Sequence, residues 1–380
     1  MQLLPNQQHY QKMLDHLERK HRLRTLPQQQ GIDFCSNDYL AFSQHTRIRT
    51  AIQNALNNGL PVGAGGSRLL GGNHAVFQSL ETMAAHFYGS EACLYFNSGY
   101  AANVAVFATL PKRGDRIFFD SDVHASILDG IKLSRASAET FHHYDVSDLQ
   151  HKINAWRHTG GIGQIWVAIS SLGSMQGDQA PLHDFIQLFG QLDGFLFIDE
   201  AHATGVFGKD GRGLAASYLH DNHIITLHTC GKALGLTGAL LCTNQLLHHY
   251  LVNHARPFIY STAPSPLIAV GVQEALKILV EEPQHQQELT GLYRYANECY
   301  VSLTGEPGSN SHILPVYLAS NELTMQTANR LNQHGFAVQA IRPPTVPSGT
   351  ARIRISITRH VTKDHINRLF TCLSDIMSTA

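Results

Sequence analysis

The sequence predicts an α/β fold, with a large domain built on a mostly parallel seven-stranded sheet covered by helices and a smaller α+β domain at the C-terminus. Short, continuously apolar runs such as Phe195–Ile198 indicate strands that are buried on both faces, as in parallel sheets. Helical patterns between these runs, for example Tyr100–Thr109 and Pro181–Phe189, indicate βαβ units. After about residue 265 the pattern changes to a long helix over Pro266–Glu281, followed by alternating strand-like and helical segments.

The expected elements follow from these patterns. A charged amphipathic helix over about residues 8–25 precedes the main body. Strands of the large domain are expected at Ala92–Phe96, Arg116–Phe119, Ile165–Ile169, Phe195–Ile198, Ile224–Leu227 and Ala239–Cys242. In the small domain we expect strands at Ile313–Leu318, Ala337–Ala340 and Arg352–Ile357, and helices at Glu322–His334 and Thr362–Met377. The expected division is an N-terminal helix and arm over residues 1–50, a large ligand-binding domain over residues 51–265 and a small domain over residues 266–380.

The composition argues against several classes of protein. The 380 residues allow about two domains, and a formal net charge of -1 provides no strong field to attract nucleic acid or anionic lipid. The chain begins without a basic segment followed by an apolar run, and no apolar stretch approaches the ~20 residues of a membrane helix, so we expect neither a secretory signal nor a membrane segment. The six cysteines are far apart and form no C-x-x-C pair, which argues against a disulfide framework and favours a cytoplasmic location.

The 24 histidines raise the question of a metal site. The adjacent pairs His142-His143 and His248-His249 are the obvious candidates, but their surroundings are poor in the Asp, Glu and Cys side chains that complete such sites. We therefore expect most histidines to be surface residues and expect no bound metal.

Ligands of open α/β sheets bind beyond the carboxyl ends of the strands, so the residues after each expected strand are candidates for a site. Ser98-Gly99-Tyr100 lies between a strand and a helix start, where free backbone N–H groups can bind a phosphate, although a plain capped turn would look the same. His124 opens the next helix, either as a residue that stacks on a planar ligand or as a helix cap. Ser174 follows a third strand in a loop on the same side, which is equally consistent with a turn.

Two further strand ends carry ionisable groups. Asp199 ends a buried strand, where a carboxylate is costly without a partner, and a protonated pyridine nitrogen is one such partner. His202 can reach the same ligand, with a structural ion pair as the competing explanation. Lys232 lies close to Thr229, Cys230 and small residues, where loss of solvent favours the neutral amine that forms an imine. Each signal is weak alone, but their order at successive strand ends favours one shared site.

Eight segments extend the pattern: SNDYLAFS at 36–43, GAGGSRLLGGNH at 63–74, NSGYAANVAV at 97–106, SMQGD at 174–178, IDEAHATGVFG at 198–208, GKALG at 231–235, IYSTAPS at 259–265 and IRPPTVPSGTARIRIS at 341–356. They resemble those of the α-oxoamine synthase family, a branch of the pyridoxal 5'-phosphate (PLP) enzymes with the aspartate aminotransferase fold, fold type I. The resemblance runs from about Leu14 to the C-terminus. It implies PLP as cofactor, bound by the large domain, and an acyltransferase that joins an amino acid to an acyl thioester with loss of carbon dioxide.

The resemblance also implies roles for the candidate residues. Catalysis would rest on Lys232, His124 and Asp199, with the lysine bonded to PLP and the aspartate paired with the pyridine nitrogen. The cofactor-binding residues would be Gly99, Tyr100, Ser174, Asp199, His202, Thr229 and Lys232. The substrate-binding residues would be Arg24, His124, Thr345 and Arg354, the last as a clamp on the amino-acid carboxylate.

The segment at 341–356 makes the finest distinction. By resemblance it favours L-alanine and a pimeloyl thioester, the substrates of a step in biotin biosynthesis, with either coenzyme A or a carrier protein as the acyl carrier. The runner-up is a glycine-using acyltransferase of the same family, of the 2-amino-3-ketobutyrate or 5-aminolevulinate type. Other classes that stay open are an aminotransferase or lyase on the same fold and a non-enzymatic binding protein. Because Ser261-Thr262 would reach the phosphate of a neighbouring subunit, the resemblance implies a homodimer with active sites near the subunit interface.

Overall fold

The computed structural model describes residues 4–26, 30–190, 192–218, 221–318 and 320–378, so the ends of the expected N-terminal arm and small domain, residues 1–3 and 379–380, lie outside the described ranges. The chain divides into two compact units. The large unit consists of residues 38–174 and 178–288, and the small unit consists of residues 1–37, 175–177 and 289–380.

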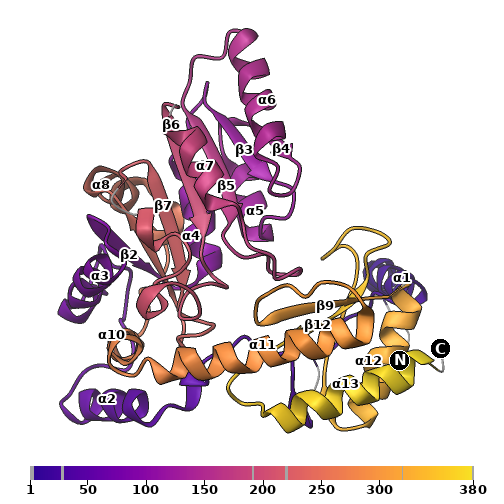
Figure 1. The fold of residues 1–380 in the computed structure, drawn as a ribbon. Coiled ribbons are helices and arrows are strands. Elements are labelled where there is room, and N and C mark those ends of the chain that lie inside the picture. Colours follow the sequence, from indigo (N-terminus) through magenta and orange to yellow (C-terminus); the bar gives the residue numbers. More distant parts are fainter. Residues whose placement is uncertain (1–3, 27–29, 191, 219–220, 319, 379–380) are drawn as a thin grey trace. The chain divides into compact units, whose positions relative to one another are not determined.

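A seven-stranded sheet forms the centre of the large unit (Figure 1). Its strands, in spatial order, are β2 (Ala92–Phe96), β8 (Ala239–Thr243), β7 (Ile224–Thr229), β6 (Gly194–Asp199), β5 (Ile165–Ser170), β3 (Arg116–Asp120) and β4 (Ser137–Phe141). Only β8 runs against its neighbours, so the predicted mostly parallel sheet is confirmed. The register pairs Ser170 with Asp199 and Asp199 with Leu227, which aligns the carboxyl ends of β5, β6 and β7 at one edge.

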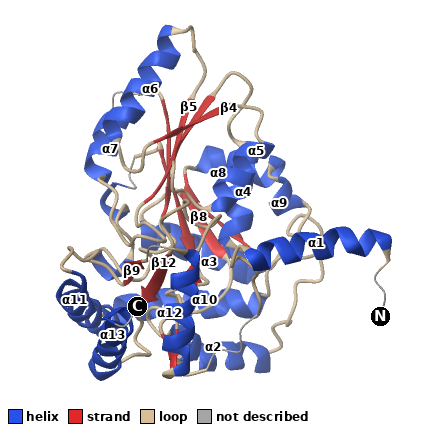
Figure 2. Ribbon diagram, turned by 90° about the vertical axis from the view of Figure 1, so that its right-hand side faces the viewer, coloured by secondary structure: helices blue, strands red, loops and turns tan. Residues whose placement is uncertain are grey.

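Helices cover both faces of this sheet, as βαβ connections require. Figure 2 shows α4, α5 and α8 on one side of the sheet and α6 and α7 on the other. The helices of the large unit are α2 (Thr46–Asn57), α3 (Ala75–Tyr88), α4 (Gly99–Thr109), α5 (Ala125–Leu133), α6 (Val146–His158), α7 (Leu182–Phe189), α8 (Gln245–His254), α9 (Arg256–Ile259) and α10 (Pro266–Glu281). Short 3-10 turns lie at η1 (Phe42–Gln44), η2 (Lys209–Gly211) and η3 (Ala216–Tyr218). The core between α4 and the sheet is apolar and includes the fully buried Phe107 and Phe197, whose rings meet edge to face at 5.1 Å.

The small unit is the predicted α+β assembly. Its main sheet has the order β11 (Ala340–Ile341), β12 (Arg352–Ser356) and β9 (Ile313–Tyr317), all antiparallel. A second, two-stranded parallel ladder joins β1 (Ile32–Asp33) to β10 (Phe336–Ala337). The helices are α1 (Pro5–Arg19), α12 (Asn321–Gln333), α13 (Lys363–Ser378) and α11 (Gln284–Thr304), whose residues from 289 onward belong to this unit. Among the described residues, no helix is both long and apolar enough to cross a membrane.

Two of the expected elements are wrong in extent. The N-terminal helix ends at Arg19 and does not reach residue 25, because His21 adopts φ +53° and the Arg22 N–H bonds back to the Leu17 carbonyl at 2.7 Å, as in a helix-ending Schellman turn. The expected strand at Ala337–Ala340 is two short strands in different sheets.

The division into units also differs from the expected domain ranges. Helix α10, which we assigned to the small domain, packs against α2 and α3 and belongs to the large unit. The first 37 residues belong to the small unit, since β1 pairs with β10. Apolar residues on α10 such as Val272 and Leu276 are fully or almost fully buried, which explains why the helix stays with the large unit.

Candidate active site

A pocket of about 130 Å³ lies at the carboxyl edge of the large unit's sheet. Every predicted cofactor-binding residue lines it, together with His124. The lining residues are Gly99, Tyr100, Asn103, His124, Ser170, Ser174, Asp199, Ala201, His202, Leu227, Thr229 and Lys232. The strand ends thus bring together residues that are more than 130 positions apart in the sequence (Gly99 to Lys232).

One wall of the pocket is the N-terminus of α4. The Ser98 hydroxyl caps the helix by accepting the Ala101 N–H at 3.1 Å, and Gly99 is the first helical residue. A side chain at Gly99 would lie 3.6 Å from the Thr229 Oγ1, so glycine keeps the space between the helix start and the end of β7 clear. Backbone N–H groups and the positive end of the helix dipole make this wall suitable for an anionic group.

Asp199 supplies the buried negative charge. The residue is 6% exposed, and its carboxylate accepts from the Ala201 N–H at 2.9 Å and from the Asn103 Nδ2 at 3.1 Å. Both of these donors are neutral amides. The Asn103 Oδ1, also buried, has no hydrogen-bond partner among the described residues. The Asp199 carboxylate and the Asn103 Oδ1 are both suited to accept from a cationic N–H group. A protonated ring nitrogen is such a donor, and PLP has one.

His124 stands beside Asp199 in the same network. Its Nδ1 contacts the Ser126 hydroxyl at 2.7 Å, and that hydroxyl accepts from Asn103 Nδ2 at 2.9 Å. Burial lowers the pKa of His124, Asp199 opposes this effect and the positive charge of Lys232 reinforces it. With a pKa below the usual ~6.5, the imidazole is neutral near pH 7 and can lie against an aromatic ring without adding charge.

His202 is oriented by a tyrosine from the start of the large unit. The Tyr39 hydroxyl lies 2.7 Å from the His202 Nδ1, and Tyr39 is fully buried. When Tyr39 donates to Nδ1, the histidine carries its proton on Nε2 and can donate from there. Sequence reasoning missed both Tyr39 and Asn103. They lie inside the segments SNDYLAFS and NSGYAANVAV, which carry the family resemblance, but the sequence alone assigned no role to either residue.

Lys232 lies in the turn that follows β7 and is partly buried. Its carbonyl accepts the Gly235 N–H at 2.8 Å, which closes the turn. Gly235 has φ +68°, and a side chain there would meet the Ser43 N at 2.1 Å, so only glycine fits. The GKALG segment therefore fixes the lysine backbone at the pocket.

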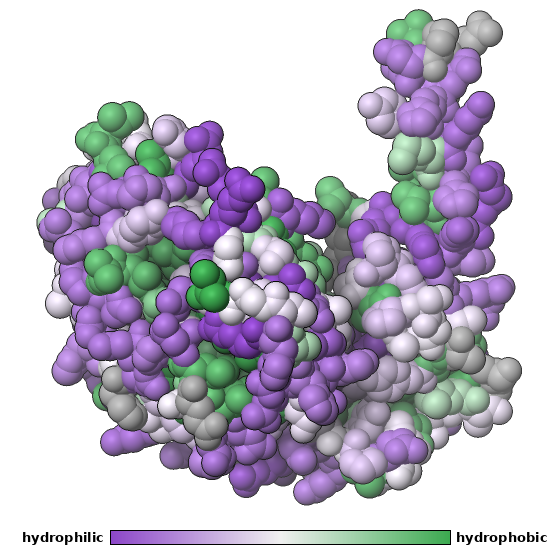
Figure 3. All heavy atoms as spheres, turned by 90° about the horizontal axis from the view of Figure 1, so that it is seen from above, coloured by the Kyte–Doolittle hydropathy of each residue, from purple (hydrophilic) through white to green (hydrophobic). Residues whose placement is uncertain are grey.

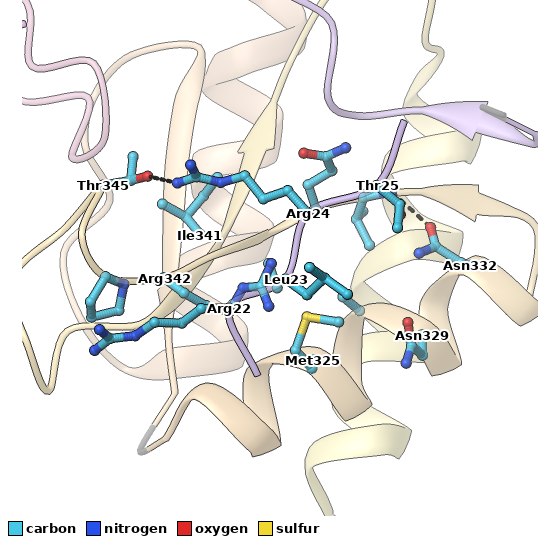
Figure 4. Close-up of a pocket in the computed structure, with 15 residues that line it drawn as sticks. Arg22, Leu23, Arg24, Thr25, Met325, Asn329, Asn332, Ile341, Arg342 and Thr345 are labelled. Atoms are coloured by element: carbon cyan, nitrogen blue, oxygen red, sulfur yellow. Dashed lines mark hydrogen bonds between the residues drawn. The ribbon is translucent and has the colours of Figure 1, made fainter. Parts of the chain in front are cut away.

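Two predicted substrate residues lie in the small unit and contact each other. The Arg24 Nη2 donates to the Thr345 Oγ1 at 2.9 Å, in a cavity of about 420 Å³ (Figure 4). Arg22 and Arg342 line the same cavity. Burial lowers the pKa of Arg342, and the nearby charge of Arg24 lowers it further. Like charges gathered in a recess favour an anionic ligand.

Arg354, the third predicted substrate residue in the small unit, lies on β12 and is 8% exposed. Both of its terminal nitrogens donate to the Asn37 Oδ1 at 3.2 Å, and Nη1 also donates to the Ser356 Oγ at 2.8 Å. These neutral acceptors hold the planar guanidinium in place, which suits the two-pronged binding of a carboxylate.

Comparison with known proteins identifies the class. Residues 29–373 match the model of the family described as aminotransferase class I and II, and the chain belongs to that family. It is 39% identical to an 8-amino-7-oxononanoate synthase from Chromobacterium violaceum, over 91% of this chain and 93% of that protein. The structure of an 8-amino-7-oxononanoate synthase from Francisella tularensis matches with a TM-score of 0.79 at 30% identity, covering 92% of this chain and 98% of that one. A serine palmitoyltransferase from S. paucimobilis, solved with bound PLP, has the same fold with a TM-score of 0.88 at 23% identity, covering 100% of this chain and 99% of that one. The predicted resemblance to the α-oxoamine synthases and the predicted fold class are confirmed.

Proposed function

We propose that this chain is a PLP-dependent 8-amino-7-oxononanoate synthase, which joins L-alanine to a pimeloyl thioester with release of carbon dioxide and free thiol. The observation that carries the proposal is the single pocket that contains Lys232, Asp199, His124 and His202 beside the start of α4. Relatives of that name, which match nearly the whole chain, support the choice of substrates. We assign the reaction to the cytoplasm, in keeping with cysteines that are all free thiols.

The pocket residues divide the work of holding the cofactor. We assign the covalent attachment to Lys232, the pyridine nitrogen to Asp199 and the phosphate to the start of α4 with Gly99, Tyr100 and Thr229. Ser174 and His202 would contact the phenolic oxygen, with the histidine held by Tyr39. When bound, PLP withdraws electrons from the amino-acid α-carbon, so that its C–H and C–C bonds can break.

Lys232 is also the proposed general base. With PLP and L-alanine in the pocket, the Lys232 amine at the pocket wall would take the proton from the α-carbon. The α-carbon then forms a bond to the thioester carbonyl, the thiol leaves, and the alanine carboxyl group departs as carbon dioxide. A proton returned to the same carbon completes 8-amino-7-oxononanoate. His124, neutral because of its lowered pKa, would stack on the ring and contact the substrate.

Residues of the small unit are the proposed substrate ligands. Arg354, whose guanidinium is oriented by hydrogen bonds to Asn37 and Ser356, would bind the alanine carboxylate. Arg24 and Thr345 would contact the acyl substrate, and the charges of Arg22 and Arg342 in the same cavity suit its anionic groups (Figure 4). The acyl carrier is coenzyme A or a carrier protein.

A homodimer is part of the proposal. On α1, Tyr10, Met13, Leu14 and Leu17 follow the i, i+3, i+4, i+7 spacing of one helical face, yet they are 68%, 55%, 47% and 38% exposed. Figure 2 shows α1 projecting from the other elements of its unit, and Figure 3 shows green apolar side chains among hydrophilic ones along it. A second copy of the chain is the partner that would cover this face. Ser261 and Thr262, tethered by the Asn97 Nδ2 at 2.8 and 2.7 Å, would reach the phosphate in the neighbouring subunit.

The test is to incubate the PLP-loaded protein with L-alanine and pimeloyl-CoA, and in parallel with a pimeloyl carrier protein, and to identify the product by mass. We expect 8-amino-7-oxononanoate, carbon dioxide and one free thiol per turnover. Glycine replaces alanine in a matched reaction, and a faster rate with glycine and a short acyl-CoA would move the assignment to the glycine-using acyltransferases. Amino-group exchange with a keto acid, without thiol release, would indicate an aminotransferase instead.

A further inference from the structure

A cluster of three metal-ligating side chains lies outside the cofactor pocket. His45 is the residue before α2, Glu282 follows the last residue of α10, and His285 lies in the first turn of α11. All three belong to the large unit. One ligand atom from each lies within 4.8 Å of the other two. No spacing in the sequence points to this group, because 240 positions separate the two histidines.

The distances within the cluster match a tetrahedral coordination shell. The Nε2 atoms of His45 and His285 lie 3.3 Å apart. Two nitrogens bound tetrahedrally at about 2.0 Å from a zinc ion are separated by ~3.3 Å. The Glu282 Oε2 lies 2.8 Å from the His285 Nε2 and 3.7 Å from the His45 Nε2, values that bracket the same separation. The three atoms therefore surround a point at bonding distance from each of them, with one side left for water.

Packing holds the two imidazoles in this orientation. The fully buried Phe42 meets both rings edge to face, with each pair of centroids 5.3 Å apart, and the two imidazole rings lie 5.1 Å from each other. The side chains of His45, His285 and Glu282 are 16%, 10% and 23% exposed. This partial exposure lets an ion enter while the rings stay fixed.

The charge around the cluster favours a cation. The Arg47 Nη1 donates to the Glu282 Oε1 at 2.6 Å, which leaves Oε2 turned to the histidines. Arg47 also contacts Glu274 and Glu281 at 2.7 Å each, and Lys277 adds one more positive charge at 3.4 Å from Glu274. Three carboxylates against two cations leave a net negative charge beside the two imidazoles.

We propose that His45, Glu282 and His285 bind one divalent transition-metal ion of the zinc class, with water completing its coordination. Two imidazole nitrogens and one carboxylate oxygen suit zinc, cobalt or nickel and do not suit the all-oxygen preference of calcium or magnesium. The ion would join the start of α2 to the α10–α11 corner and would stabilise the large unit. None of its three ligands lines the cofactor pocket, so the site is distinct from the catalytic one.

The affinity follows from the number of ligands and their outer contacts. Three protein ligands, rather than four, indicate an open site with exchangeable water. The buried His285 Nδ1 has no hydrogen-bond partner among the described residues. A hydrogen bond from the second ring nitrogen of a ligating histidine typically raises metal affinity 10–100-fold, and this site lacks that contribution at His285. We therefore expect a dissociation constant in roughly the micromolar range, weaker than that of a closed structural zinc site.

The experiment is a calorimetric titration of metal-free, PLP-loaded protein with zinc chloride, accompanied by thermal unfolding with and without zinc. The wild type should bind one ion per chain in this range, above any weaker background from other histidines, and its Tm should rise. His285→Gln and Glu282→Gln should each weaken this binding event at least 30-fold and remove the rise in Tm. The matched control, Glu274→Gln, removes a carboxylate that binds the same Arg47 without touching the histidines, and it should change the affinity less than threefold.

Circular dichroism and PLP content show whether each variant is folded, and His45→Gln repeats the test from a different element. Zinc binding that is equal in the wild type and all three ligand variants would overturn the proposal, because the ion would then sit elsewhere. If no binding of one zinc ion per chain is detected at zinc concentrations up to about 100 times the expected dissociation constant, the proposal is overturned as well.

Discussion

The carboxylate of Asp199 shows how one buried residue determines the chemistry of the pocket. It ends β6, is almost fully buried and accepts hydrogen bonds from the amides of Ala201 and Asn103. Its neighbour Glu200, the first residue after β6, is held by other partners and accepts from the N–H groups of Leu214 and Ala215 at 3.0 and 2.6 Å. Of two adjacent acids, only Asp199 lines the pocket.

Asp199→Asn should separate cofactor binding from cofactor activation. The amide fills the same space and can still accept from Ala201, so we expect part of the PLP to remain bound. It cannot keep the pyridine nitrogen protonated, so exchange of the alanine α-proton with deuterated water should fall by at least 100-fold, as for loss of a key proton-transfer group. Proton NMR of alanine measures the exchange, and an exchange rate equal to that of the wild type would refute the role of Asp199.

At the scale of elements, an ion-pair bridge connects β3 with the loop after β5. The His143 Nδ1 lies 2.8 Å from Asp120 at the end of β3, and its Nε2 lies 2.9 Å from Asp178. Burial alone would lower the pKa of His143, but hydrogen bonds to the two carboxylates outweigh it and raise the pKa to about 10. The ring also stacks on Tyr144, with centroids 3.8 Å apart. The bridge therefore stabilises the loop that carries Ser174 into the pocket.

His143→Gln should destabilise the protein in a pH-dependent way. Because the pKa of His143 in the folded state is above the ~6.5 of an unfolded histidine, its contribution is fully present below about pH 6.5 and is lost as the pH rises through about 10. At pH 7 we expect the variant to lose about 2 kcal/mol in the free energy of unfolding, with the difference from wild type shrinking as the pH rises toward about 10.

Urea unfolding at several pH values measures this effect. The control is His142→Gln at the adjacent position, where the side chain is 81% exposed, and it should leave the free energy of unfolding unchanged within about 0.5 kcal/mol. A constant difference between His143→Gln and wild type from pH 6 to pH 10.5 would show that the bridge does not depend on a charged histidine.

The strands of the large unit differ in how well the sequence predicts them. Strands β5 and β6 are apolar up to their last residues, Ser170 and Asp199, and were predicted to within a residue at each end, since burial on both faces leaves a clear pattern. Strand β4, Ser137–Phe141, was not predicted, because it lies at the sheet edge with mostly exposed residues and has no apolar run. The site residues were predictable as strand-end residues. The hydrogen bonds that orient them, from Tyr39 and Asn103, depend on packing between distant segments and leave no local signal.

At the scale of the whole molecule, the proposed dimer explains an exposed apolar face on α1. An amphipathic helix normally buries such a face, and here Tyr10, Met13, Leu14 and Leu17 are exposed. The net charge of -1 offers no strong repulsion between two copies. A second copy of the chain would remove this apolar area from water.

Met13→Glu combined with Leu17→Glu should weaken the dimer. Two charges on the apolar face would have to lose water in the interface, which costs several kcal/mol, so the dissociation constant should rise by at least 100-fold. Sedimentation equilibrium measures it. Gln8→Glu, on the same helix at an exposed polar position, is the control and should leave the dimer intact. A wild-type protein that is monomeric at micromolar concentration would contradict the proposed dimer.

The most direct test of the proposed function is to map the lysine that holds the cofactor. The PLP-loaded protein is reduced with borohydride, digested and analysed by mass spectrometry. We expect a phosphopyridoxyl group on the peptide that contains Lys232 and on no other, and we expect Lys232→Ala to carry no such group and to have no synthase turnover. A label on another lysine such as Lys209, or turnover retained by Lys232→Ala, would contradict it.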